Sequence, residues 1–103
     1  NINLYYTPAQ VFSNHVPAGV RFRVGGMVVK GSVHHQAKRL AVRFDLTDCH
    51  RRISVYYNGI LPSLFREGQG IVAQGKLNKK GIFVADQVLA KHDANYHPPG
   101  ISK

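Results

Sequence analysis

Short segments in which apolar and polar residues alternate are the feature of this chain that most restricts its fold. Residues 20–24 alternate strictly, and the same pattern returns in residues 40–46 and 52–57. Alternation with a period of two is typical of a strand with one buried face. The apolar face of the second segment carries Leu40, Val42, Phe44 and Leu46. The third segment ends at Asn58-Gly59, a strong turn pair, so an all-β chain is predicted.

Two further strands complete the predicted sheet. They cover residues 71–77 and 82–90, and a turn at residues 78–81 separates them. The first strand is interrupted by Gly25-Gly26 and resumes at residues 27–29. A glycine pair inside a strand predicts a bulge or a sharp bend, which a small barrel needs at its corners.

The segment between Gly59 and Gly70 breaks the alternation. Its apolar residues Leu61, Leu64 and Phe65 lie at helical spacing, which predicts a short helical turn that plugs one end of the barrel. Five short strands with one helical turn before the fourth favour a small OB-like five-stranded β-barrel.

A chain of 103 residues is long enough for one domain with a modest core. The barrel domain is predicted to span residues 1–91, beginning with an N-terminal strap packed on the barrel. The strap residues are Tyr5-Tyr6-Thr7-Pro8, Val11 and Phe12. Strand pairing past Lys91 is opposed by Asn95, Pro98, Pro99 and Gly100. Residues 92–103 are therefore predicted to form a flexible C-terminal tail.

The predicted tail carries two residues that can bind iron. His92 precedes Tyr96 by four positions, and Pro98-Pro99 follows them. An imidazole is also a nucleophile, and tyrosine is a known type of haem-iron ligand. The two side chains share a face if one helical turn forms, whereas in an extended chain they lie about 13 Å apart. The tail need not be a formed site by itself, because a bound ligand could order it.

The run from Leu89 to Pro99, Leu-Ala-Lys-His-Asp-x-Asn-Tyr-x-Pro-Pro, resembles the haem-attachment signature of the CcmE family, the haem chaperones of cytochrome c maturation. Residues 57–70 resemble the family's other strong block, and residues 23–28 with 31–33 resemble its first hairpin. In that family the histidine bonds covalently to a haem vinyl group and the tyrosine is an axial ligand of the iron. The resemblance implies these two roles for His92 and Tyr96.

The same resemblance implies a function and a cellular setting. The expected function is transient covalent binding of haem and its delivery to apocytochrome c, which is not enzymatic turnover. Expected partners are haem, the membrane proteins of cytochrome c maturation and apocytochrome c. The resemblance also implies a monomer on the periplasmic side of the bacterial inner membrane, held by an N-terminal anchor that precedes Asn1. His97, where the family commonly has methionine, offers a further nitrogen ligand to the haem iron.

The formal charge of +9, from 14 Lys and Arg against 5 Asp and Glu, favours an anionic partner. Nucleic acid, a membrane surface and haem propionates all qualify. The basic residues that fall mostly on strand faces opposite the apolar sets are Arg21, Arg23, Lys30, Arg43, Arg52 and Lys91. They are expected to be solvated, or in part to meet haem propionates.

The alternative function is single-stranded nucleic-acid binding, which needs outward aromatics among basic residues. Tyr56 is the best outward candidate, while Phe22, Phe44 and Tyr57 fall on apolar faces. This distribution weakens the alternative, and the tail motif has no role in it.

Metal and disulfide chemistry outside the tail find little support. Cys49 is the single cysteine and is expected to be a small core or turn residue. His34 and His35 are adjacent, so in a strand they face opposite sides and cannot share one metal ion. A structural zinc site is therefore not expected. No apolar run approaches the roughly 20 residues that span a bilayer.

Overall fold

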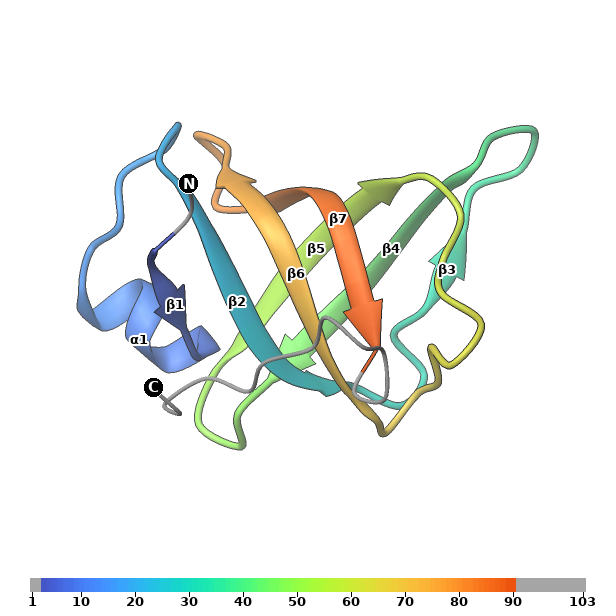
Figure 1. Cartoon of the computed structure of the whole chain (residues 1–103), viewed down its shortest axis with the longest axis horizontal. Coiled ribbons are helices and arrows are strands. Elements are labelled where there is room, and N and C mark those ends of the chain that lie inside the picture. The colour runs from blue at the N-terminus through green and yellow to red at the C-terminus, as the bar shows by residue number, and fades with distance from the viewer. Residues whose placement is uncertain (1–2, 91–103) are drawn as a thin grey trace.

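A computed structural model describes residues 3–90 of the chain, so His92, Tyr96, His97 and the rest of the predicted tail lie outside the described residues. Five main strands form a barrel (Figure 1): β2 (Arg21–Val28), β4 (Ala41–Thr47), β5 (Arg52–Asn58), β6 (Gly70–Leu77) and β7 (Phe83–Ala90). Two-residue strands lie at the sheet edges, β1 (Tyr5–Tyr6) and β3 (His34–His35). The helix is α1 (Pro8–Ser13).

The five main strands close on themselves. Their order in the sheet is β1-β2-β6-β7-β5-β4-β3, and a further pairing of β2 with β4 joins the two sides. Met27 takes part in this closure, because it pairs with Gly70 of β6 and with Thr47 of β4. Among the main strands, β5 and β7 run parallel and the other pairs antiparallel. The predicted all-β, OB-like barrel is confirmed.

Aromatic and β-branched side chains from the inward faces fill the barrel. Phe22 and Phe83 meet edge to face, with ring centroids 5.0 Å apart, and both are fully buried. Inward residues that the alternation predicted include Val24, Val42, Phe44, Leu46, Ile53 and Val55. Leu40 departs from the prediction, since its side chain is 64% exposed. The reason is that β4 begins one residue later, at Ala41, so Leu40 lies outside the strand.

The glycine pair of β2 does not form a bulge, so that part of the prediction is wrong. Gly25 and Gly26 pair in unbroken register with Val72 and Ile71 of β6. A Cβ on Gly26 would lie only 2.9 Å from the carbonyl oxygen of Thr47. This glycine therefore permits the close approach of β4 where the barrel closes. The irregularity in the sheet lies between β6 and β7 instead.

The segment from residue 59 to residue 69 forms turns, and the predicted helical turn is wrong. Leu61 precedes Pro62, and a residue before proline is disfavoured in the helical region of backbone space. A turn forms instead, in which the amide of Phe65 donates to the carbonyl of Pro62 at 3.0 Å. Phe65 is nevertheless buried, with only 9% of its surface exposed, and its ring packs edge to face on Phe44. The loop thus reaches into the core without helical structure.

The N-terminal strap packs on the barrel as predicted but contains a helix that the alternation did not predict. Thr7 caps α1, because its hydroxyl accepts from the amide of Gln10 and the Gln10 side chain accepts from the amide of Thr7. Val11 is buried against the core. The signal was present as Thr7-Pro8-x-Gln10, a capping box with proline in the first turn.

Cys49 lies in the turn that joins β4 and β5, so the expectation of a turn residue holds and that of a buried one is wrong. Its thiol is exposed and its φ is +75°. The adjacent Asp48 organises this turn. Burial raises the pKa of Asp48, but hydrogen bonds from the amides of Arg51, Ala9 and His50 outweigh it and lower the pKa from 3.8 to about 2. Since Ala9 belongs to α1, this carboxylate ties the strap to the barrel.

We expect the free energy of unfolding to fall between about pH 5 and pH 2 because Asp48 becomes protonated. Its pKa is lower in the folded state than in the unfolded chain, so its contribution is present above pH 3.8 and is lost as the pH falls toward 2. Asp48→Asn should cost about 1 kcal/mol at neutral pH, after allowance for solvent screening. It should also flatten the pH dependence in urea denaturation.

Asp86→Asn is the matched control for this prediction. The Asp86 carboxylate forms an ion pair with Arg21 at 2.9 Å, and both side chains are about half exposed, at 50% and 44%. Its removal should change stability by less than about 0.5 kcal/mol. Equal losses in the two variants would contradict the role given to Asp48.

Candidate functional site

The predicted haem-binding residues follow directly after the last described strand. Strand β7 ends at Ala90, which is buried and pairs with Ile71 of β6. In the sequence, His92 follows Ala90 by two positions. The start of the tail and the roles of His92, Tyr96 and His97 stay predictions.

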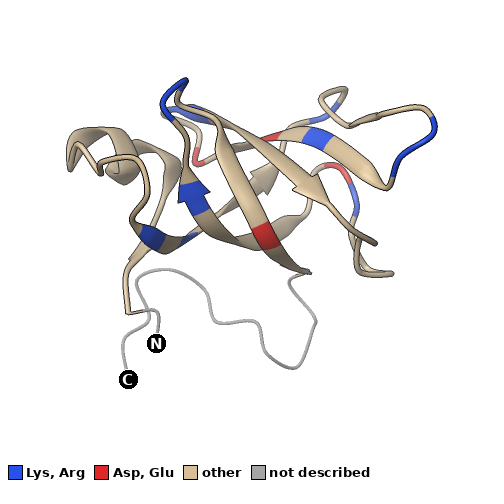
Figure 2. Ribbon diagram, turned by 90° about the horizontal axis from the view of Figure 1, so that it is seen from above, with Lys and Arg blue, Asp and Glu red and all other residues tan. Residues whose placement is uncertain are grey.

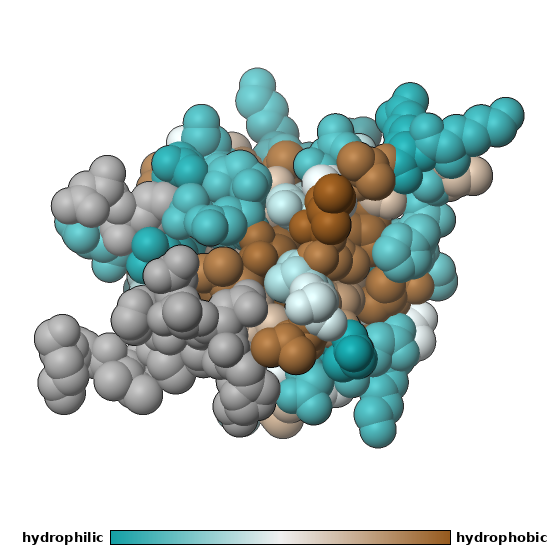
Figure 3. All heavy atoms as spheres, turned by 45° about the vertical axis from the view of Figure 1, so that its right-hand side comes forward, coloured by the Kyte–Doolittle hydropathy of each residue, from teal (hydrophilic) through white to brown (hydrophobic). Residues whose placement is uncertain are grey.

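An apolar groove, here named the loop groove, runs beside the loop that leads into β6. One part has a volume of about 370 Å³ and is lined by Val33, His35, Leu61, Pro62, Phe65, Arg66 and Glu67. A smaller part of about 210 Å³ shares His35 and Leu61 and adds Arg39, Leu40, Val42, Gly59 and Ile60. Ile60 is 78% exposed, which is unusual for so large an apolar side chain. Hydrophobic surface is visible on this side of the molecule, between polar margins (Figure 3).

The loop that lines the groove leads into the start of β6, and this start lies beside the C-terminal end of β7 (Figure 1). The loop delivers the chain to Gly70, and the next residue, Ile71, is the partner of Ala90. Two backbone hydrogen bonds tie the end of the loop to Val28, one from the Gly68 amide at 2.7 Å and one to the Gln69 carbonyl at 2.9 Å. A ligand attached just past Ala90 would therefore begin near this groove.

Two side chains of the loop are held in place by hydrogen bonds. The Arg66 guanidinium donates to the carbonyls of Ser63 and Phe65 at 2.9 and 2.8 Å. The Glu67 carboxylate accepts from the amide of Val33 at 3.3 Å. These bonds position a guanidinium at the groove and join its two walls.

Lys and Arg residues occur on several sides of the barrel (Figure 2). The strand residues Arg21, Arg23, Arg43 and Arg52 are exposed or half-buried, as predicted for faces opposite the apolar sets. Two of them are neutralised, Arg21 by Asp86 and Arg52 by Asp45. Arg43 has no carboxylate partner within residues 3–90.

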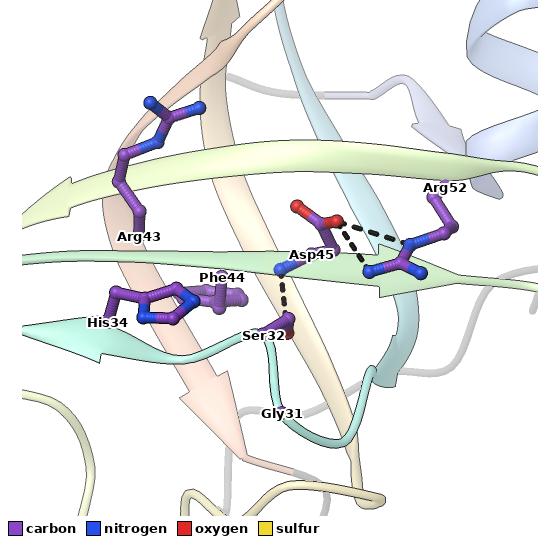
Figure 4. Close-up of a pocket in the computed structure, with 7 residues that line it drawn as sticks. All are labelled: Gly31, Ser32, His34, Arg43, Phe44, Asp45 and Arg52. Carbon is purple, nitrogen blue, oxygen red and sulfur yellow. Dashed lines mark hydrogen bonds and ion pairs between the residues drawn. The ribbon is translucent and has the colours of Figure 1, made fainter.

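A polar pocket of about 410 Å³ lies on the outer face of β4 (Figure 4) and is lined by Gly31, Ser32, His34, Arg43, Phe44, Asp45 and Arg52. Asp45 accepts from Arg52 at 2.8 Å and from the Ser54 hydroxyl at 3.0 Å. His34 lines this pocket, whereas His35 lines the loop groove, so the predicted opposite orientation of the two is confirmed. Residues 3–90 contain no cluster of three or more side chains suited to a metal ion.

The aromatic side chains are placed as the alternation predicted. Phe22 and Phe44 are buried, and Tyr57 packs against the core. Tyr56 is half-buried and lines an outer groove of about 250 Å³ together with Arg43 and Lys80.

Comparison with known proteins relates this barrel to one family. A model described as the CcmE domain matches residues 2–99. The chain is 56% identical to cytochrome c-type biogenesis protein CcmE of Pseudomonas syringae pv. tomato over 103 residues, which are all of this chain and 66% of that relative. It is 57% identical to the protein of the same name from Pseudomonas putida strain F1, of which it covers 68%. The chain thus spans about two-thirds of the length of these relatives.

A solved structure supports the fold assignment. The OB-fold domain of the haem chaperone CcmE from Desulfovibrio vulgaris is similar to this chain with a TM-score of 0.64 and 22% identity. The match covers 74% of this chain and 91% of that domain. With the family model matched over nearly the whole sequence, the chain belongs to the CcmE family.

Proposed function

We propose that this protein is a haem chaperone of cytochrome c biogenesis that binds haem covalently and transiently through His92 and delivers it to apocytochrome c. The observation that carries the proposal is the CcmE-domain match over residues 2–99, a range that includes both His92 and Tyr96. Further support comes from relatives named for cytochrome c-type biogenesis and from a solved neighbour described as a haem chaperone.

A carrier has to hold haem and then release it, and the described surface suits a weak hold. The loop groove lies at the surface, where His35 and Ile60 are exposed, so it would bury only part of a planar ligand. Exposed ion pairs contribute only about 0–1 kcal/mol each. A covalent bond from His92 would retain the haem without a deep pocket and would leave it accessible to an acceptor. This is binding and delivery, so the protein is not proposed to be an enzyme.

The loop groove is the part of the barrel best suited to a porphyrin next to His92. Its apolar side chains, among them Leu61 and Ile60, can contact the ring. The guanidinium groups of Arg39 and Arg66 can meet the two propionates. Tyr96 would then bind the haem iron, and His97 offers a further imidazole.

The proposed setting follows from the family assignment. The expected partners are the membrane proteins of cytochrome c maturation and apocytochrome c, on the periplasmic side of the bacterial inner membrane. An N-terminal anchor would hold the domain there as a monomer. Within residues 3–90, no helix has both the length and the apolar character that crossing a membrane requires. Fractionation of cells that express the full-length gene product tests this setting.

Tyr96→Phe should keep covalent haem attachment but change the ligand field of the iron. The substitution removes only the phenol oxygen, and the bond to the vinyl group belongs to His92. We expect shifts in the ferric absorption and EPR spectra, with a further shift in Tyr96→Phe combined with His97→Ala, because the His97 imidazole can replace the lost ligand. If both variants retain the wild-type spectra, neither residue is an axial ligand.

Single-stranded nucleic-acid binding is the competing hypothesis, and it would use the outer groove at Tyr56. OB folds bind oligonucleotides on this part of the barrel. They usually stack successive bases on several aromatic rings, whereas this groove offers Tyr56 between Arg43 and Lys80. Oligonucleotide binding measured against salt, beside a haem titration, separates the two functions.

A further inference from the structure

His35 lines both parts of the loop groove, as Leu61 does. It pairs with Val42, whose side chain is buried in the core, so His35 faces the barrel side of the sheet. His34 pairs with Arg43 and faces the outer polar pocket (Figure 4). One imidazole of this adjacent pair therefore lies in an apolar groove and the other in a polar pocket.

The side chain of His35 is available to a ligand. It makes no hydrogen bond or ion pair with any residue between positions 3 and 90, and it is exposed. Two other charged groups of the groove already have partners, Glu67 through the amide of Val33 and Arg66 through two loop carbonyls. His35 is thus an unengaged nitrogen ligand among Leu61, Pro62 and Phe65.

These features match an iron porphyrin better than a free metal ion. A zinc ion in a protein needs about three or four side-chain ligands, and the described residues offer no such cluster here. Haem iron already has four porphyrin nitrogens, so it needs only one ligand from each side of the ring, and histidine is a common one. The groove supplies apolar walls for the ring and two guanidinium groups for the propionates.

We propose that His35 is an axial ligand of the haem iron, donated from the barrel side while haem lies in the loop groove. The proposal rests on the proposed function in that it takes haem as the cargo. His35 would bind the iron from the face of the porphyrin that meets the loop groove. The barrel would then take part in iron coordination, in addition to offering an apolar surface to the porphyrin.

The test uses the full chain in which His92→Ala, Tyr96→Phe and His97→Ala remove the candidate tail ligands. Ferric haem is titrated into this background variant, with and without His35→Ala, and followed by the Soret band and by EPR. We expect His35→Ala to weaken haem binding about tenfold or more, which is about 1.4 kcal/mol, and to change the EPR signal. His34→Ala is the matched control. It should leave the haem affinity and the EPR signal unchanged, because His34 lies in the polar pocket.

Iron-free protoporphyrin IX separates iron coordination from a structural role of His35. This probe has the same ring and propionates but no metal, so His35→Ala should bind it as well as the background variant does. Equal loss of protoporphyrin and haem binding would overturn the proposal. So would equal effects of His34→Ala and His35→Ala, or no haem binding by the background variant.

Mass spectrometry of the wild-type chain and of His35→Ala from haem-producing cells distinguishes this proposal from the proposed function. A haem adduct on His92 in both proteins, with an unchanged titration in His35→Ala, removes only the role of His35. An absent adduct in the wild-type chain would contradict the covalent chaperone function. The haem titration would still test whether His35 binds the iron.

Discussion

Replacement of His92 by alanine is expected to abolish covalent haem attachment and to leave the barrel folded. His92 comes two positions after Ala90 in the sequence, and Ala90 is the last residue of β7 and is buried. The core cluster is drawn from residues of the barrel and strap, so a change at position 92 removes no core contact that residues 3–90 make. The loss should be complete, because alanine has no nucleophilic atom to bond with the vinyl group.

The measurement is intact-protein mass spectrometry of chains purified from haem-producing cells, with the modified peptide mapped. His97→Ala is the matched control, since it removes an imidazole five positions further along and should keep the adduct. Circular dichroism and thermal unfolding should match the wild-type chain for both variants. A stable adduct on His92→Ala would refute the assignment and direct attention to His97 or to the exposed thiol of Cys49.

Gly75→Ala is expected to cause the largest loss of stability of any substitution that adds a single methyl group to the barrel strands. Gly75 pairs with Ala85 at the irregularity between β6 and β7. A Cβ at this position would overlap the carbonyl oxygen of Val84 and lie 2.8 Å from the Cα of Ala85. Both atoms belong to the backbone, so relief requires the strands to separate. We expect a cost of about 3 kcal/mol, the upper end of what overpacking costs.

For a domain of this size, the expected cost corresponds to a fall in melting temperature of about 12 °C or more. Lys76→Ala is the control in the next residue of the same strand, where the side chain is exposed and the change should stay within about 0.5 kcal/mol. Urea denaturation of both variants gives the comparison. A Gly75→Ala variant as stable as Lys76→Ala would show that β6 and β7 can separate at little cost.

The strands were predictable because their signal is local. A period of two within five to eight residues identifies the buried face of β4 or β5 without knowledge of any partner strand. The sequence-based prediction was wrong where helical spacing competes with another preference of the chain or with tertiary contacts. Leu61, Leu64 and Phe65 have helical spacing, yet Pro62 opposes a helix, and the position of Phe65 depends on its contact with Phe44.

The candidate haem site also has one part that the sequence predicts and another part that it does not predict. His92 and Tyr96 were recognised from a contiguous run of residues, and their roles stay predictions. The loop groove has no contiguous signal, since it brings together Val33, His35 and Leu61 from two separate segments. The difference between His34 and His35 could be predicted as opposite faces, but not which face meets the groove.

The sequence by itself determined the all-β class, the approximate limits of five strands and the resemblance to the CcmE family, because each is encoded in short runs of adjacent residues. Only the tertiary structure decided how β2 bridges β6 and β4, why Gly26 and Gly75 carry no side chain, and where His35 lies. These features depend on contacts between segments far apart in the chain. Such contacts form only when the closed barrel brings the segments together, so no local pattern reports them.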